Sequence, residues 1–309
     1  MESSISPLDG RYYSRMSRVR NFFSESSLIQ SRIQVEISYV VFLGKILNFP
    51  TSIFQKDIDF NLSETDLNEI KNIEKKIHHD VKSVEVFLRN RYKSISTHKE
   101  DQKIIEWIHF GLTSQDINHL AFLKLYQPFF KELIKDWTHF VDLVEKSATE
   151  WMSITMLSHT HGQPATPTTL GHTMMVFVDR WRQVIAATNN LTWSVKFGGA
   201  TGGLNAHYHV YPNIDWKKEF DSFILDQGFT RQQWTTQIDH YDSLCESFDC
   251  LSRLATISID FCRDIWSYIS INYIGLKKLN SEQVGSSTMP HKVNPIHFEQ
   301  SEGNLMLAV

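Results

Sequence analysis

Apolar residues recur at intervals of three or four along much of the chain, which is the period of an amphipathic α-helix packed against a core. The clearest stripe begins after Ser63-Glu-Thr-Asp66, a string with the form of a helix-starting capping box, and continues to Leu88. The stripe predicts a single helix of about thirty residues in this region. The same pattern predicts long helices over residues 113–150, 168–195 and 242–272.

Shorter apolar stripes predict the remaining elements. They are a helix that ends near Leu47, a short helix from Trp216 to Leu225, and a helix starting at Asn294-Pro295 with Asn294 as its cap. Pro128 falls inside the 113–150 stripe and is expected to kink or divide that helix. These elements predict an all-α fold, an elongated bundle of long helices with its chemically dense strings in the loops.

The composition is that of a globular protein and argues against two classes of partner. The chain has 309 residues, 41% of them hydrophobic and 21% charged, which favours about two domains. A net charge of -4 argues against a nucleic-acid partner, although Arg11, Arg15, Arg18 and Arg20 cluster locally and could meet an anion. The apolar run at 37–44 is too short to cross a bilayer. Because the first residues also lack the pattern of a signal peptide, a cytoplasmic protein without membrane partners is expected.

The cysteines and histidines do not follow metal-binding patterns. Cys245, Cys250 and Cys262 share one predicted helix without a C-x-x-C spacing, so reduced thiols are expected. None of the 14 histidines belongs to an HExxH string or a zinc finger. The glycine-rich residues 197–203 match neither GxGxxG nor GxxxxGK, which argues against a phosphate-binding P-loop. We predict no metal and no cofactor.

The stretch from 285 to 295, GSSTMPHKVNP, is the densest in chemistry. Its useful groups are the hydroxyls of Ser286 and Ser287, the ammonium of Lys292 and the side chain of Asn294. An ammonium suits a carboxylate or a phosphate, and the glycine at its start permits unusual backbone angles. The pattern predicts a loop that closes over a substrate and delivers a base.

Further chemistry lies at the predicted start of the 113–150 helix and in two loops. Thr113-Ser-Gln-Asp116 has a capping-box pattern, and a helix N-terminus also favours a bound carboxylate. The proline-rich residues 157–167 are predicted to form a loop that carries His159 and His161.

Five strings along the chain, GSSTMPHKVNP, HHDVKSVE, TSQDIN, THGQPATP and TTQI, resemble the fumarase and aspartase superfamily. HHDVKSVE, TSQDIN and the opening SPLDGRYY are most similar to its adenylosuccinate lyase branch. The resemblance covers essentially the whole chain. It implies the superfamily's all-α long-helix fold, with an N-terminal helical domain at 1–112 and a central bundle domain at 113–309. It also implies a homotetramer in which three subunits build each active site.

The resemblance further implies the reaction and the roles of particular residues. The expected reaction is β-elimination of fumarate from adenylosuccinate, and from the ribosyl-carboxamide analogue SAICAR, in purine nucleotide synthesis. The implied catalytic residues are Ser286 as general base, His161 as general acid, and His79 as a residue that orients the phosphate or the base. The implied substrate-binding residues are Arg11, Tyr12, His78, Asp80, Thr113, Ser114, Gln237, Ser287, Lys292 and Asn294.

The chain departs from the family pattern at several of these places. His159 stands where the family usually has Arg, and His240 lies where a Pro-His-Asp string is usual. His297 and Gln300 stand where the family usually has Asp and Asn.

Two alternative interpretations stay open. One is another fumarate-releasing lyase, such as an argininosuccinate-type enzyme, against which the SPLDGRYY, HHDVKSVE and TSQDIN strings argue. The other is an inactive helical scaffold, because the chain ends at Val309 within a predicted helix and is expected to lack the family's C-terminal third. This chain alone is therefore expected to be weakly active or inactive.

Overall fold

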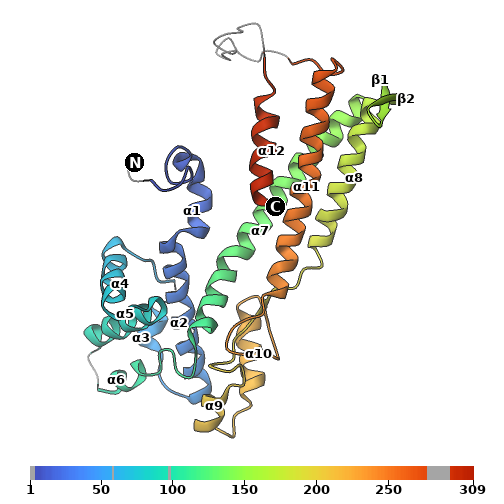
Figure 1. Ribbon diagram of the computed structural model, residues 1–309. Helices are drawn as coiled ribbons and strands as arrows, with labels where there is room; N and C mark the ends of the chain where they lie inside the picture. The colour runs from blue at the N-terminus through green and yellow to red at the C-terminus, as the bar shows by residue number, and fades with distance from the viewer. Residues whose placement is uncertain (1–3, 58, 97–98, 277–292) are drawn as a thin grey trace. The chain divides into compact units, whose positions relative to one another are not determined.

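The computed structural model describes residues 4–57, 59–96, 99–276 and 293–309, and its secondary structure is dominated by helices. The chain forms two compact units. Figure 1 shows the chain as a ribbon coloured by residue number, from blue at the N-terminus to red at the C-terminus. The first contains residues 1–132 and 192–241, and the second contains 133–191 and 242–309. The domain boundary predicted between residues 112 and 113 stays a prediction.

The first unit is built mainly from short and medium helices. They are the 3₁₀ helix η1 (Tyr13–Met16), α1 (Ser17–Phe23), α2 (Glu25–Leu47), α3 (Ser52–Gln55), α4 (Glu64–Ile77), α5 (Asp80–Ile95), α6 (Lys99–Ile105), the start of α7 (Ser114–Glu150), α9 (Asn205–Val210) and α10 (Trp216–Asp226). Two short parallel strands, β3 (Ser194–Val195) and β4 (Thr230–Arg231), pair in the same unit.

The predicted thirty-residue helix after Ser63 is wrong, because the chain breaks at His78 and forms α4 and α5. His78 adopts a left-handed conformation, with φ 55°, in which its N–H bonds the carbonyl of Glu74 and ends α4. His79 is extended and caps α5, its Nδ1 accepting a hydrogen bond from the Lys82 N–H at 3.2 Å. The apolar spacing continues across the break because both helices pack on one core, in which Ile70 of α4 and Val84 of α5 are buried.

The second unit holds the longest helices. They are the rest of α7, α8 (Leu170–Thr188), α11 (Asp242–Ser270) and α12 (Ile296–Ala308), which Figure 1 shows beside α11. Its core joins Val141 of α7, Trp181 of α8 and Leu254 of α11, all fully buried. Side chains of this size contribute about 1.5–3 kcal/mol each on burial, so the predicted amphipathic stripes account for this packing.

The structure excludes a division of the helix at Pro128 and corrects the predicted start of the last helix. The helix α7 runs through Pro128 without division, because a proline removes only one backbone donor while apolar neighbours such as Tyr126 and Phe130 remain buried. The last helix begins at Ile296 with Pro295 at its cap position, and no side chain caps it. Asn294 therefore lies one residue too early to be the cap.

The predicted loop at 157–167 is instead most of an antiparallel hairpin, β1 (Thr155–Thr160) with β2 (Gln163–Thr169). Its threonines favour extended backbone, and a two-stranded ribbon has free edges where a proline that lacks an N–H is tolerated. The hairpin leads directly into α8, whose cap is Thr169. Among the described residues, no helix combines the length and apolar character that crossing a membrane requires.

Candidate functional site

The N-terminus of α7 is held in place by the chain that leads into it. Gly111, with φ +69°, lies so close to His207 that an added Cβ would come within 2.5 Å of the imidazole ring. The Tyr39 hydroxyl donates to the carbonyl of Phe110 at 2.7 Å, and His207 Nε2 lies 2.7 Å from the same hydroxyl. Burial lowers the pKa of His207 to about 4, so its ring is a neutral hydrogen-bonding group.

One of the two hydrogen bonds of the predicted capping box at Thr113 is confirmed, namely the bond from the backbone of Thr113 to the Asp116 carboxylate. The Thr113 N–H donates to Asp116 Oδ2 at 2.8 Å, and the helix begins at Ser114. The first N–H groups of a helix have no partner within it and carry the positive end of the helix dipole. This end of α7 can therefore bind a carboxylate, as the sequence analysis proposed for Thr113 and Ser114.

His79 reaches the same helix end from α5. Because His79 Nδ1 accepts the Lys82 N–H, its hydrogen is assigned to Nε2, which lies 3.4 Å from Ser114 Oγ. Both side chains are partly accessible to solvent. The structure thus brings together two predicted site residues that are 35 positions apart in sequence.

Asp80 is held by a neighbouring arginine. Arg32 Nη2 lies 2.6 Å from Asp80 Oδ2, and Arg32 Nε donates to Asn118 of α7 at 2.8 Å. Partial burial favours the neutral acid, but the arginine outweighs it and lowers the pKa of Asp80. The pair ties α2, α5 and α7 together close to His79. His78 is exposed at the break between α4 and α5.

Arg11 and Tyr12 lie just before η1 in the first unit. The contacts that the structure gives this pair are local: the Arg11 guanidinium lies 5.6 Å from the Tyr12 ring centroid, and the Tyr12 N–H bonds the Pro7 carbonyl. The Arg15 guanidinium lies 5.8 Å from the centroid of the same ring, so two cations lie near one aromatic side chain.

Gln237 is exposed. The segment around it, residues 234–241, contacts α7 at two places. Gln115 Nε2 donates to the Tyr241 hydroxyl at 2.6 Å, and His119 Nε2 lies 3.2 Å from Asp239 Oδ2. A cavity of about 500 Å³ opens in the same segment, but Gln237 itself does not line it. Its lining residues are Trp234, Thr235, Thr236, Ile238, Asp239 and His240.

His161 lies at the tip of the β1–β2 hairpin, in the second unit. Thr160 pairs with Gln163, so His161 and Gly162 form a two-residue turn, and their φ values are 54° and 71°. Two central residues with positive φ are what a type I′ turn requires. The turn presents the imidazole to solvent. His159, one of the departures from the family pattern, has its ring centroid 5.7 Å from that of Tyr273.

Three predicted site residues, Ser286, Ser287 and Lys292, lie outside the described residues. Asn294 is partly buried just before α12.

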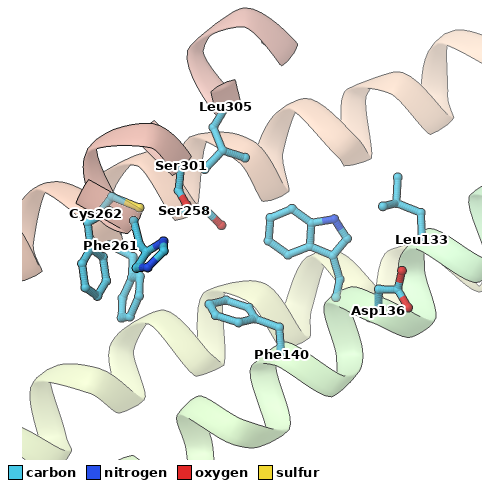
Figure 2. A pocket seen from close by; sticks show the side chains of 11 residues that line it. Leu133, Asp136, Phe140, Ser258, Phe261, Cys262, Ser301 and Leu305 are labelled. Carbon is cyan, nitrogen blue, oxygen red and sulfur yellow. The ribbon is translucent and has the colours of Figure 1, made fainter. Parts of the chain in front are cut away.

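An apolar cavity of about 350 Å³ lies within the second unit, shown in Figure 2. Leu133 and Phe140 of α7 line one side, and Phe261 of α11 and Leu305 of α12 line another. His297 is also in its lining, but the lining is predominantly apolar. Such a cavity does not suit a dianionic substrate, because charge is costly to move out of water without polar partners.

Asp116 of the capping box also belongs to a buried polar cluster behind the predicted site, whose other members, Lys196 and His119, were not predicted from the sequence. Asp116 and Lys196 form an ion pair with 2.7 Å between Oδ1 and Nζ, and both side chains are fully buried. His119 is buried beside them. Lys196 stands between Val195 and Phe197, and a charge in an apolar string is the signal that could have indicated a buried partner. Among the described residues, no group of three or more His, Cys, Asp or Glu side chains could hold a metal ion.

The chain is similar to known proteins over nearly all of its length. A family model described as Lyase matches residues 10–308. The adenylosuccinate lyase of Dictyostelium discoideum is 44% identical, and those of Haemophilus influenzae and Escherichia coli K12 are 41% and 40% identical. Each alignment covers 99% of this chain and 68% of the relative, so the chain spans about two thirds of the relatives' length.

Solved structures support the fold. A fumarate lyase from Mesorhizobium sp. BNC1 aligns with a TM-score of 0.72 at 16% identity, over 94% of this chain and 63% of the other. The 3-carboxy-cis,cis-muconate lactonizing enzyme of Pseudomonas putida aligns with a TM-score of 0.75 at 19% identity, over 94% and 64%. At these identities the likeness shows the fold alone, which is the all-α fold predicted from the sequence. The family match and the relatives at 40–44% identity together show that the chain belongs to the lyase family and, within it, to the adenylosuccinate lyases.

Proposed function

We propose that the chain provides binding and acid–base groups for elimination of fumarate from adenylosuccinate, which leaves AMP, and for the same cleavage of SAICAR to AICAR. The observation that carries the proposal is the meeting of His79 and Ser114 at the N-terminus of α7. Two of the resembling strings, far apart in sequence, converge there on a helix end suited to a carboxylate. The adenylosuccinate lyases at 40–44% identity support the choice of substrate.

The helix end has a definite task in such a reaction. Splitting a C–N bond beta to a carboxylate removes a weakly acidic proton from the carbon next to that carboxylate. The carboxylate then gains a second negative charge. Most of the activation barrier comes from forming this charge, so groups that stabilise it lower the barrier. Preorganised donors of this kind are commonly worth a few kcal/mol each. Thr113 and Ser114 supply such donors here, and Lys292 and Asn294 are assigned the same task by the resemblance.

The proton transfers are assigned to two residues. Ser286 is the proposed base, brought to the substrate by its loop, with Lys292 and the loop amides stabilising its anionic form. His161 is the proposed acid, because an imidazole can donate a proton near neutral pH to the departing nitrogen. Support for His161 comes from its place at an exposed hairpin tip, where nothing within its own turn blocks a substrate.

We further propose a homotetramer in the cytoplasm, with three subunits contributing to each active site. His161 and Gln237 are both exposed in the single chain. Exposure of this kind is expected of groups that enclose a substrate only after assembly, since an active site must exclude water to strengthen its electrostatic interactions.

The proposed function is tested by measuring fumarate release from the 309-residue chain, with the Escherichia coli relative as positive control. Adenylosuccinate is compared with argininosuccinate, and binding of each is measured by calorimetry. We expect binding of adenylosuccinate with weak turnover. Turnover of argininosuccinate alone would favour the argininosuccinate-type alternative, and binding of neither compound would favour the scaffold.

A further inference from the structure

The Asp116 carboxylate gathers donors from two separate segments of the first unit. Its Oδ2 accepts the Thr113 N–H at 2.8 Å and the Gly199 N–H at 3.1 Å. Its Oδ1 accepts the Gly198 N–H at 2.8 Å and the Lys196 ammonium at 2.7 Å. The carboxylate thus joins the N-terminus of α7 to the glycine-rich loop that follows β3.

The contacts extend from Lys196 to the segment that carries Gln237. The Lys196 ammonium also donates to the Gly199 carbonyl at 2.6 Å. The backbone N–H of Lys196 donates to His119 Nδ1 at 3.1 Å. The second bond places the His119 hydrogen on Nε2, which lies 3.2 Å from Asp239 Oδ2, a close contact without the geometry of a hydrogen bond. Burial lowers the pKa of His119 despite this carboxylate, so the ring packs against Asp239 as a neutral group.

The glycine-rich loop fits around the ion pair only because it lacks side chains. A Cβ on Gly198 would lie 2.7 Å from the Gly202 carbonyl oxygen. A Cβ on Gly199, whose φ is +77°, would lie 2.8 Å from the Gly111 carbonyl oxygen. The close approach of the loop to the start of α7 therefore depends on these glycines.

Stability alone does not account for such a buried pair. Replacing a buried ion pair by apolar residues of similar volume is often neutral or stabilising, because the desolvation of two charges offsets their attraction. What an apolar replacement could not supply is a single anion that accepts hydrogen bonds from both segments.

We propose that Asp116 and Lys196 are positioning residues that hold the carboxylate-binding end of α7 and, through His119, the Gln237 segment in fixed relation. This inference rests on the proposed function, since it assigns the pair to the same site. Neither residue touches substrate. They act through Thr113 and Ser114 on one side and through Gln237 on the other.

The experiment compares Asp116→Asn, Lys196→Met and the double variant with the unaltered chain. Glu132→Gln is the matched control, because it breaks the ion pair of Glu132 with Arg18 in the same unit, where both side chains are about half exposed. Three quantities are measured: the melting temperature, the Kd for adenylosuccinate, and amide hydrogen exchange at residues 113–118, 198–199 and 237–239.

Each single variant leaves an uncompensated buried group, so its melting temperature should fall. In the double variant both charges are gone, and the melting temperature should largely recover. The Kd should not recover and should stay about tenfold to a hundredfold above that of the unaltered chain, because the single acceptor oxygen of an amide cannot satisfy all the backbone N–H groups that the two carboxylate oxygens accept. Recovery of the Kd together with the melting temperature would overturn the proposal.

Amide exchange provides a test that does not depend on the substrate. Lys196→Met should speed exchange in all three segments, and the Glu132 control should leave them unchanged. Faster exchange confined to 198–199 would overturn the proposal even if substrate binds. If the unaltered chain does not bind adenylosuccinate, the proposed function fails, and the exchange pattern still decides whether the pair couples the segments.

Discussion

His161 shows how a single backbone conformation can determine where a catalytic candidate points. Its φ of 54° belongs to the left-handed region, which few residues other than glycine occupy, although histidine, asparagine and aspartate are enriched there. Strained positions of this kind often occur at functional sites. His79 likewise has two tasks, because one ring nitrogen caps α5 and the other faces Ser114.

Substitution of His161 separates the turn from the chemistry. Asparagine tolerates the left-handed conformation, so His161→Asn should keep the hairpin and lower fumarate release about 10²-fold to 10⁴-fold. His161→Ala should lose the same activity and also destabilise the turn by about 1–2 kcal/mol. Fumarate assays with hydrogen exchange at 155–169 measure both effects. Normal turnover in His161→Asn would remove His161 as the acid.

Substitution of His79 separates capping from function in the same way. His79→Ala should lower the free energy of unfolding by about 0.5–2 kcal/mol, because the N-cap acceptor is lost. His79→Asn supplies a new cap acceptor and should keep the stability, but it should lower kcat/KM by at least about tenfold. Urea unfolding and steady-state kinetics test this. Full activity in His79→Asn would reduce His79 to a structural cap.

At the scale of the elements, a buried ion pair joins α2 to the segment before α7. His109 Nδ1 lies 2.6 Å from Glu36 Oε1, and the Glu36 side chain is fully buried. Its other oxygen, Oε2, is buried and lacks a hydrogen-bond partner among the described residues. Burial of the His109 ring favours its neutral form, but the Glu36 carboxylate outweighs burial and raises the pKa of His109.

The raised pKa of His109 predicts a stability that depends on pH. A histidine with a higher pKa in the folded state stabilises the fold fully below its unfolded pKa of about 6.5. This contribution is lost as the pH rises through the folded pKa. His109→Gln should therefore lower the free energy of unfolding more at pH 5.5 than at pH 8.5.

Urea unfolding at the two pH values measures the difference. The exposed His139, changed to Gln, is the matched control, and this change should have little effect on the free energy of unfolding, because an exposed side chain makes few contacts. If His109→Gln lowered the free energy of unfolding equally at both pH values, the assignment of a protonated His109 beside the Glu36 carboxylate would be contradicted.

At the scale of the whole molecule, the predicted site residues are divided between the two compact units. His79, Ser114 and Gln237 belong to the first unit, and His161 and Asn294 belong to the second. If each active site contains residues from several copies of the chain, one copy can supply a catalytic residue that another copy lacks. Because a site made within one chain could not be repaired in this way, mixing of defective chains can test the proposed tetramer.

We expect His161→Asn and Ser286→Ala chains, each inactive alone, to regain fumarate release when they are unfolded and refolded together. Some mixed sites would then contain an intact serine from one copy and an intact histidine from another. Chains that are refolded separately and then mixed are the control and should stay inactive if assembly is stable. No recovery in mixtures shown by light scattering to be assembled would contradict shared sites.

Much of the site could be found from the sequence because its residues lie in short local strings. The α7 cap at Thr113 needs only a backbone N–H and a carboxylate three residues later, so its capping box was readable without the fold. The break at His78 was not readable, because it depends on a histidine adopting a left-handed conformation that sequence patterns predict poorly. The hairpin at 155–169 was missed because two prolines concealed its extended strands.

The sequence by itself determined the long helices and their apolar faces, since helical periodicity is a property of neighbouring residues. It also determined the family, whose strings are local. Only the tertiary structure decided that α4 and α5 are separate, that His79 meets Ser114, and that Asp116 pairs with Lys196. The last two contacts join residues 35 and 80 positions apart, and a pairing over such distances depends on how the helices pack rather than on any local pattern.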